Sequence, residues 1–178
     1  MPFPYAISGL SDAIDVSAGV SSSCAVRMSG RVVCWGANLD GKLGDGTETD
    51  RYTPVEVLDL TDAVEVSVGE LHACARRRGG TVACWGANSM GQLGVVPSGI
   101  LVKHLRPVQV PGITDATRLA VGSLASCAQR ATGGIVCWGG DIFGALIDLL
   151  WVVDEAWRAG VTGMDQTGSG MVMPEQQR

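Results

Sequence analysis

Apolar and polar residues alternate in short runs along most of the chain, and turn-forming residues interrupt these runs. The run PVEVLDL at 54–60 is followed by AVEVSVG at 63–69 and then by two runs that each contain a cysteine. Alternation with a period of two indicates β-strands, whereas an amphipathic helix places apolar residues three and four apart. The pattern therefore predicts short strands, about four in every roughly fifty residues.

This strand pattern occurs three times, at 16–44, 66–94 and 119–147. In each copy two cysteines stand ten positions apart, and a tryptophan directly follows the second cysteine. A sheet of about four strands per fifty residues has the size of a propeller blade. We therefore expect an all-β fold, a partial β-propeller of about three four-stranded blades, over residues 1–146. The repeats run at about 4–53, 54–106 and 107–146.

The repeat pattern stops after Leu146. Ile147, Leu150, Trp151 and Trp157 have near-helical spacing, which predicts a short amphipathic helix or an irregular tail over 147–178. Such a helix would cover the exposed edge of the last blade. The alternative is a frameshifted, non-native tail.

The cysteine spacing predicts a hairpin in each repeat. If Cys24 faces Cys34, then Arg27 closes against Arg31 and the three-residue loop ends at Gly30. A hairpin loop of this length favours glycine in the left-handed conformation at its third position. The cysteines then occupy a non-hydrogen-bonded pair with a Cα separation of about 4.5 Å, which a disulfide tolerates.

Three disulfides within hairpins are therefore expected, with reduced buried thiols or a metal or redox site as the alternatives. Zinc sites usually bring two cysteines two to four residues apart, and the sequence contains no Cys-x-x-Cys. Because disulfides persist in oxidising compartments, we expect an extracellular or cell-surface protein. The N-terminal MPFPYAISGL does not resemble a secretory signal, so we expect the signal upstream of Met1. The expected pairs are Cys24 with Cys34, Cys74 with Cys84, and Cys127 with Cys137.

Charge and hydropathy narrow the classes of partner. The net charge of −5 gives a field that repels phosphate backbones, so nucleic acid is not expected as a partner. No apolar stretch reaches about 18 residues, so no membrane span is expected. Gly-x-Ser-x-Gly, Walker and His-Glu-x-x-His motifs do not occur, and we expect no catalytic residue, cofactor or metal.

The repeats differ in length only between Gly94 and Pro107. Segments that vary between constant flanks usually carry the specificity of a scaffold. The segment 44–54 is acidic and polar, whereas 94–107 combines apolar with basic residues and would expose an apolar patch typical of an interface. The alternative is that 94–107 packs on the neighbouring blade. The candidate partner contacts are Leu101, Lys103, His104, Leu105 and Arg106.

Several conspicuous polar and aromatic residues are expected to be structural. We expect His72 to be buried and hydrogen-bonded, and the acidic run 45–50 to be a turn rather than a calcium loop. The arginines at 76–78 are expected at a solvated hairpin tip, with a partner contact as the alternative. One tryptophan per repeat at a fixed position favours core packing over ligand stacking. These tryptophans are Trp35, Trp85 and Trp138.

The motif Trp-Gly-x-Asn-x-x-Gly-x-Leu-Gly is intact at 35–44 and 85–94. With the hairpin glycine and the Pro-led strand, it resembles the regulator of chromosome condensation repeat family over residues 4–146. The third copy departs from it, with Asp141 in place of asparagine and Ile147 in place of the last glycine. The resemblance implies seven-bladed propellers that serve as platforms for protein partners, and the paired cysteines are similar to the secreted bacterial branch.

Three blades cannot close a ring that needs at least about four, so we expect a fragment of a seven-bladed ring, a mispredicted reading frame or a self-assembling piece with open blade edges. We expect a non-catalytic interaction scaffold that binds a protein or glycan partner through its blade loops. The alternatives are a propeller hydrolase or lyase, and a guanine-nucleotide exchange factor for a small GTPase.

Overall fold

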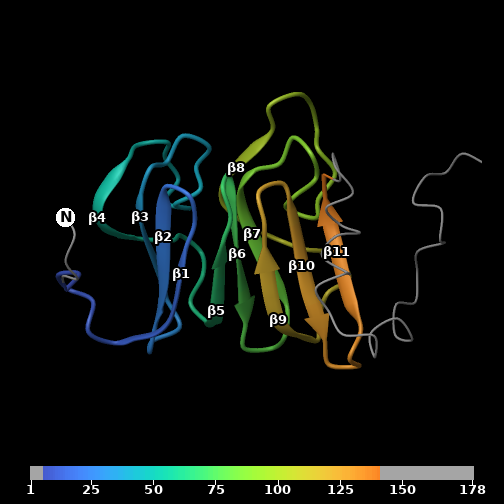
Figure 1. Ribbon diagram of the computed structural model, residues 1–178, viewed down its shortest axis with the longest axis horizontal. Helices are drawn as coiled ribbons and strands as arrows, with labels where there is room; N and C mark the ends of the chain where they lie inside the picture. Colours follow the sequence, from blue (N-terminus) through green and yellow to red (C-terminus); the bar gives the residue numbers. More distant parts are fainter. Residues whose placement is uncertain (1–5, 141–178) are drawn as a thin grey trace, which may run out of the picture.

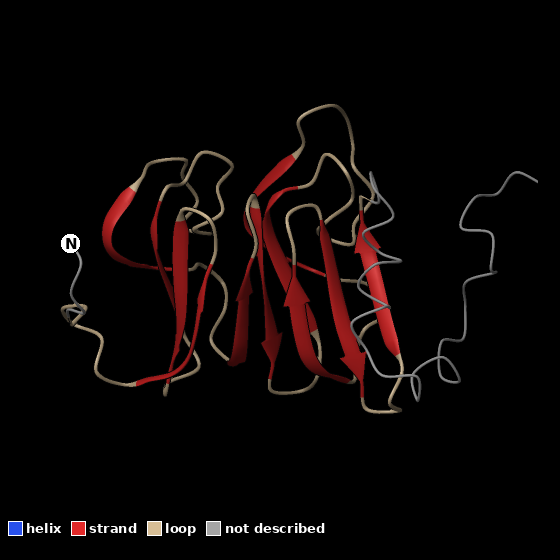
Figure 2. Cartoon of the chain, in the orientation of Figure 1, coloured by secondary structure: helices blue, strands red, loops and turns tan. Residues whose placement is uncertain are grey.

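The computed structural model describes residues 6–140, which form three antiparallel β-sheets standing side by side (Figure 1). All regular structure in this range is strand, as Figure 2 shows. The described range accordingly holds no helix that could cross a bilayer. The predicted tail at 147–178 lies outside the described residues.

Each sheet consists of strands that follow one another in the chain, so every connection is between neighbours. The order is β1-β2-β3-β4 in the first sheet, β5-β6-β7-β8 in the second and β9-β10-β11 in the third. The first sheet comprises β1 (Ala13–Ala18), β2 (Ser22–Arg27), β3 (Val32–Gly36) and β4 (Arg51–Glu56). The second comprises β5 (Ala63–Val68), β6 (His72–Arg77), β7 (Val82–Ala87) and β8 (Lys103–Gln109). The third comprises β9 (Ala116–Val121), β10 (Ala125–Arg130) and β11 (Ile135–Gly139).

The sheets are out of phase with the sequence repeat. Pro54, which begins the second repeat in the sequence, lies in β4, and Val55 beside it pairs with Cys34 of the first sheet. Pro107 likewise lies in β8 of the second sheet. Each Pro-led run thus forms the outer strand of the preceding blade. Proline has no backbone N–H to donate, and an edge strand tolerates this because no further strand of the sheet pairs with its outer side. The expectation of four strands per blade is confirmed for the first two sheets, and three strands of the third are described.

The predicted hairpins are confirmed residue by residue. Cys24 pairs with Cys34 across β2 and β3, and the N–H of Arg27 donates to the carbonyl of Arg31 at 2.8 Å. Gly30 ends the loop with a φ of 83°. The corresponding glycines of the other two hairpins, Gly80 and Gly133, have φ values of 82° and 91°. All three positions therefore use the left-handed region that glycine enters without steric cost.

The hydrophobic cores lie between the sheets. One core joins Cys24, Val26 and Val32 of the first sheet to residues of the second, including Val66 and Trp85. An equivalent core joins the second sheet to the third. The packing role expected for the tryptophans is confirmed for Trp85, which is fully buried, and for Trp138, which packs against the second core. Each blade is therefore stabilised chiefly by its neighbours, as in other repeat architectures.

Candidate interaction surface

One buried asparagine organises the loop after the third strand of each of the first two blades. The Oδ1 atom of Asn38 accepts a hydrogen bond from the N–H of Leu43 at 2.9 Å, and Asn88 accepts one from Leu93 at 3.0 Å. The Nδ2 group of Asn38 donates to the carbonyl of Thr49 at 3.1 Å, and that of Asn88 donates to the carbonyl of Val95 at 3.1 Å. The asparagine of the Trp-Gly-x-Asn motif thus fixes the position of each variable segment through side-chain hydrogen bonds.

The acidic segment 45–50 is internally hydrogen-bonded. Asp45 accepts hydrogen bonds from Thr47 at 3.0 Å and from Arg51 at 2.7 Å, while Asp50 accepts one from the N–H of Asn38 at 2.8 Å. Burial alone would raise the pKa of Asp45, but the hydrogen bonds from Thr47, Arg51 and Asn38 outweigh it and lower the pKa below its usual value. The carboxylates of Asp45 and Asp50 therefore hold the turn in shape.

The segment between Gly94 and Lys103 rises above the rest of the second blade, at the top of Figure 1. Its apolar side chains Val96, Ile100 and Leu101 are exposed, and Leu101 retains 81% of its accessible surface. Leu101 also has a φ of 58°, a conformation that costs a non-glycine residue energy. An exposed apolar group on a strained tip is typical of a surface that is kept for contact.

The two leucines proposed as partner contacts have different environments. Leu105 is half-buried in β8 and packs against Gly41 of the first blade. A Cβ atom added at Gly41 would come within 2.3 Å of the Cδ2 atom of Leu105. The idea that this region packs on the neighbouring blade is therefore correct for Leu105. It does not hold for Leu101, which is exposed.

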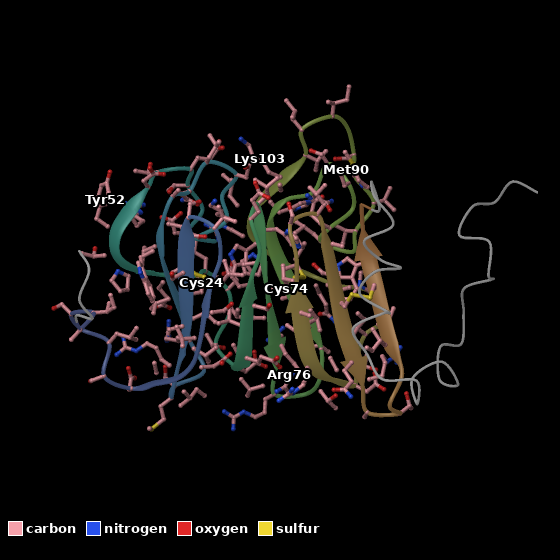
Figure 3. All side chains as sticks on the ribbon, viewed as in Figure 1. Cys24, Tyr52, Cys74, Arg76, Met90 and Lys103 are labelled. Atoms are coloured by element: carbon pink, nitrogen blue, oxygen red, sulfur yellow. A yellow bond between two sulfur atoms is a disulfide. The ribbon has the colours of Figure 1, made fainter. Side chains whose placement is uncertain are left out.

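The two variable segments meet in space. The N–H of Gly46 donates to the carbonyl of Leu105 at 3.0 Å, and Lys103 forms an ion pair with Glu48 of the acidic segment. Arg106 pairs with Asp59 at 3.0 Å. A shallow hollow of about 350 Å³ lies where the two segments meet, and Gly46 and residues 103–108 line it. Lys103 is labelled at the upper end of the molecule in Figure 3.

The sequence alone did not predict that these two segments meet. The opposite charges of Glu48 and Lys103 are a signal that could have indicated the contact, whereas Arg106 pairs with Asp59, outside the acidic segment. His104 is half-buried in β8 and lines the same hollow. Of the residues proposed from the sequence, Lys103, His104, Leu105 and Arg106 thus line one hollow together with Gly46. Leu101 lies two positions before Lys103, in the segment that also exposes Val96 and Ile100.

The sulfur atoms of all three expected cysteine pairs lie at bonding distance. The separations are 2.13 Å for Cys24 and Cys34, 2.15 Å for Cys74 and Cys84, and 2.10 Å for Cys127 and Cys137. Each bridge joins the two strands of one hairpin. The first two bridges lie in the cores between the blades, so their role is structural.

His72 is buried between the second and third blades. The hydroxyl of Ser126 donates to the carbonyl of Gln92 at 3.1 Å, so it accepts the Nε2–H of His72 at 2.7 Å. The Nδ1 atom then carries no proton, and it has no hydrogen-bond partner within the described part of the chain. Burial lowers the pKa of His72 from 6.5 to about 4. The expectation of a buried, hydrogen-bonded histidine agrees with this arrangement.

The arginine cluster is placed differently from the prediction. Arg76 and Arg77 are the last residues of β6 rather than part of the hairpin tip, and only Arg78 is at the exposed turn. Arg76 pairs with Glu65 at 2.6 Å and Arg77 with Asp62 at 2.6 Å. The prediction of a solvated tip is therefore wrong for these two residues, because Glu65 of β5 and Asp62 directly before that strand supply carboxylates. Arg76 marks the lower end of Figure 3, opposite the variable segments.

The fold and the stacked hairpins define a β-propeller repeat protein. The sequence matches models of the regulator of chromosome condensation (RCC1) repeat at residues 13–42, 63–92 and 29–76. Residues 13–92 therefore consist of regulator of chromosome condensation repeats. No curated protein matches it.

Similar solved structures include human WBSCR16, with a TM-score of 0.67 and 19% identity over 76% of this chain and 35% of that chain. Prp20p of Saccharomyces cerevisiae has a TM-score of 0.66 and 20% identity over 76% of this chain and 33% of that chain. Identities this low establish the propeller fold and no more. The chain spans about a third of the length of these proteins.

Proposed function

We propose that the protein is a non-catalytic scaffold that binds a protein partner through the surface formed by segments 45–50 and 94–107. The observation that carries this proposal is the exposed apolar tip of Val96, Ile100 and Leu101, beside the hollow between the two blades. Interfaces combine such an apolar centre with a polar rim. Here Lys103, Glu48 and Arg106 supply the rim.

The structural hydrogen bonds of the titratable side chains support a scaffold role. His72 is bonded to Ser126 in a core, and the carboxylates of Asp45 and Asp50 hold a turn. A structurally similar protein, Prp20p, is described as binding Gsp1p and histones, which supports a protein as the partner class. The hydrolase and exchange-factor alternatives gain no comparable observation from residues 6–140.

The first prediction separates binding from folding by using the two leucines. Leu101→Ser should leave the melting temperature unchanged because the side chain is exposed, and it should weaken binding to the partner at least about tenfold. Leu105→Ser should lower the melting temperature by several degrees because it removes the packing on Gly41.

The measurement combines thermal unfolding of both variants with affinity for a partner identified by crosslinking through position 100. Tyr52→Ser, a change at an exposed residue of the first blade's outer strand, is the matched control and should alter neither quantity. A binding affinity that survives Leu101→Ser, or a stability lost with it, contradicts the proposed surface.

We also propose that the protein is exported to an oxidising compartment. The proposal is supported by the three cysteine pairs at bonding distance, which account for all six cysteines of the chain. Such pairs would be kept reduced by the glutathione and thioredoxin systems of a cytosol. Free thiols at all three pairs in protein isolated from its source would contradict it.

A further inference from the structure

The hollow between the two variable segments is lined by three basic side chains from one short stretch of β8. These are the side chains of Lys103, His104 and Arg106, and Gly46 of the first blade contributes to the same lining. The whole chain carries a net charge of −5, so basic groups gathered around one hollow depart from its general acidic character. Cationic groups around a hollow attract and concentrate anions. The lining thus points to an anionic ligand.

The repeat fold does not require basic residues at these three positions. The first blade pairs its outer strand, β4, with β3 in the same register as β8 pairs with β7, although its residues there are different. The basic lining is therefore a feature of the second blade alone and is not needed to form the strand. Aligning Pro54 with Pro107 aligns Asp50 with Lys103, Arg51 with His104 and Thr53 with Arg106.

His104 lacks the partner that its counterpart in the first blade has. Arg51 donates to Asp45 at 2.7 Å, and the side chain of that aspartate is only 3% exposed. Val95 stands at the position of Asp45 in the second blade, so no carboxylate accepts a hydrogen bond from the imidazole. Among residues 6–140 the side chain of His104 has no hydrogen-bond partner, whereas those of Lys103 and Arg106 do. The imidazole in the lining is thus available to a ligand.

The other two basic side chains are held only by exposed carboxylates. Lys103 pairs with Glu48, and these side chains are 39% and 41% exposed. Arg106 pairs with Asp59, and these side chains are 60% and 65% exposed. Ion pairs this exposed contribute little to stability, so a ligand can replace either carboxylate at small cost. A ligand with two or three oxygens can also accept hydrogen bonds from more than one of the three basic groups at once.

We propose that this hollow is a binding site for an oxyanion, a phosphoryl or carboxylate group, held by Lys103, His104 and Arg106. The inference rests on the proposed function for its biological role, because it assigns a ligand chemistry to the polar rim of the partner surface. The residues of the apolar tip do not line the hollow. Binding of the oxyanion and binding through the tip are therefore tested separately.

The test titrates the full chain with inorganic phosphate and, separately, with acetate, while sodium chloride keeps the ionic strength constant. Amide NMR spectra should show saturable shifts confined to residues that line the hollow, such as Gly46 and His104. Constant ionic strength keeps general charge attraction the same throughout, so saturation indicates a site. A response to phosphate alone assigns a phosphoryl ligand, and an equal response to acetate assigns a carboxylate.

Two variants change the site in opposite directions. Arg106→Thr copies the residue at the corresponding position of the first blade, and the loss of the cation should weaken phosphate binding at least about tenfold. Glu48→Gln removes the carboxylate that competes for Lys103 and should strengthen binding about two- to fivefold. Arg31→Gln is the control, since it removes an exposed arginine that pairs with Glu56 outside the hollow, and it should leave the affinity unchanged.

Thermal unfolding of each variant shows whether its fold is retained. The proposal is overturned if neither anion gives saturable shifts, if Arg31→Gln weakens binding as much as Arg106→Thr, or if Glu48→Gln weakens it. Absence of anion binding while Leu101→Ser still weakens partner binding would defeat the oxyanion site and leave the proposed function standing. Anion binding in a chain whose partner affinity survives Leu101→Ser would have the opposite meaning.

Discussion

At the scale of single residues, equivalent positions in the three repeats carry different chemistry on the same backbone. Ser22, His72 and Ala125 correspond in the sequence, and the second of them places an imidazole in a core. His72 has one nitrogen bonded to Ser126 and the other without a partner within residues 6–140. Protonation would put a buried charge and an unpaired donor at that second nitrogen, which explains the lowered pKa.

This histidine predicts a loss of stability in acid. Its pKa falls from 6.5 to about 4 on folding. Between pH 6.5 and about 4, this imidazole is therefore protonated in the unfolded chain and neutral in the folded chain. The free energy of unfolding should therefore decrease as the pH falls from 6.5 towards about 4, by roughly 3 kcal/mol in total, and His72 should contribute no further slope below that.

Urea unfolding at a series of pH values checks this, with His72→Ser as the comparison because serine stands at the same place in the first blade. The variant should show a smaller loss between pH 6.5 and 4 than the wild type. Parallel curves for the two proteins would mean that His72 does not titrate as its burial implies.

At the scale of elements, the hairpin is the unit that local sequence determines. Its disulfide joins residues ten positions apart, and the chain-entropy model assigns a loop of this length about 3 kcal/mol. The hairpin also persists through backbone hydrogen bonds such as that from Gly80 to Arg77 at 2.9 Å. Any structure that the reduced, unfolded chain keeps in this region lowers the gain.

Removing one bridge should therefore cost about 2–3 kcal/mol of unfolding free energy. Replacing Cys74 and Cys84 together by alanine is the sharpest choice, since both are fully buried in the middle blade. Chemical denaturation of this variant beside the wild type gives the value, and peptide mapping without reductant gives the pairing. A bridge between different hairpins, or an unchanged stability, would contradict the structure.

At the scale of the whole molecule, the blades approach one another so closely that glycine is needed where backbones meet. A Cβ on Gly69 would come within 2.1 Å of the carbonyl oxygen of Gly122 in the third blade. At Gly122 itself the nearest atom to an added Cβ is the carbonyl oxygen of Ala125 at 3.5 Å, an ordinary contact. The two glycines thus occupy the same repeat position, but only the position of Gly69 lacks space for a side chain.

Gly69→Ala should accordingly destabilise the protein by about 1–3 kcal/mol, because it forces two blades apart. Gly122→Ala, the matched control, should change stability by about 0.5 kcal/mol or less. Differential scanning calorimetry of both variants distinguishes a demand of the blade junction from a general intolerance of alanine. Equal effects would show that the close approach is not what the position requires.

Much of this architecture could be predicted from the sequence because the deciding contacts are local. The register of β2 on β3 and the left-handed Gly30 follow from a spacing of ten residues that allows one hairpin geometry. The cysteine pairs follow from the same spacing. Each depends on residues close in the chain, whose meeting costs little loop entropy.

The tertiary structure alone decided which residues meet across blades. Three features depend on how neighbouring strands stack. The stacking decides whether the Pro-led run begins one sheet or ends the previous one, and whether Leu101 or Leu105 is exposed. It also decides which carboxylates pair with Arg76 and Arg77. Hydrogen bonds between blades join residues about fifty positions apart, such as the one from the N–H of Val68 to the hydroxyl oxygen of Ser17. A repeat period shows that these positions correspond, but contacts over that separation arise only when the blades pack, so the pairing of side chains is a property of the assembled stack.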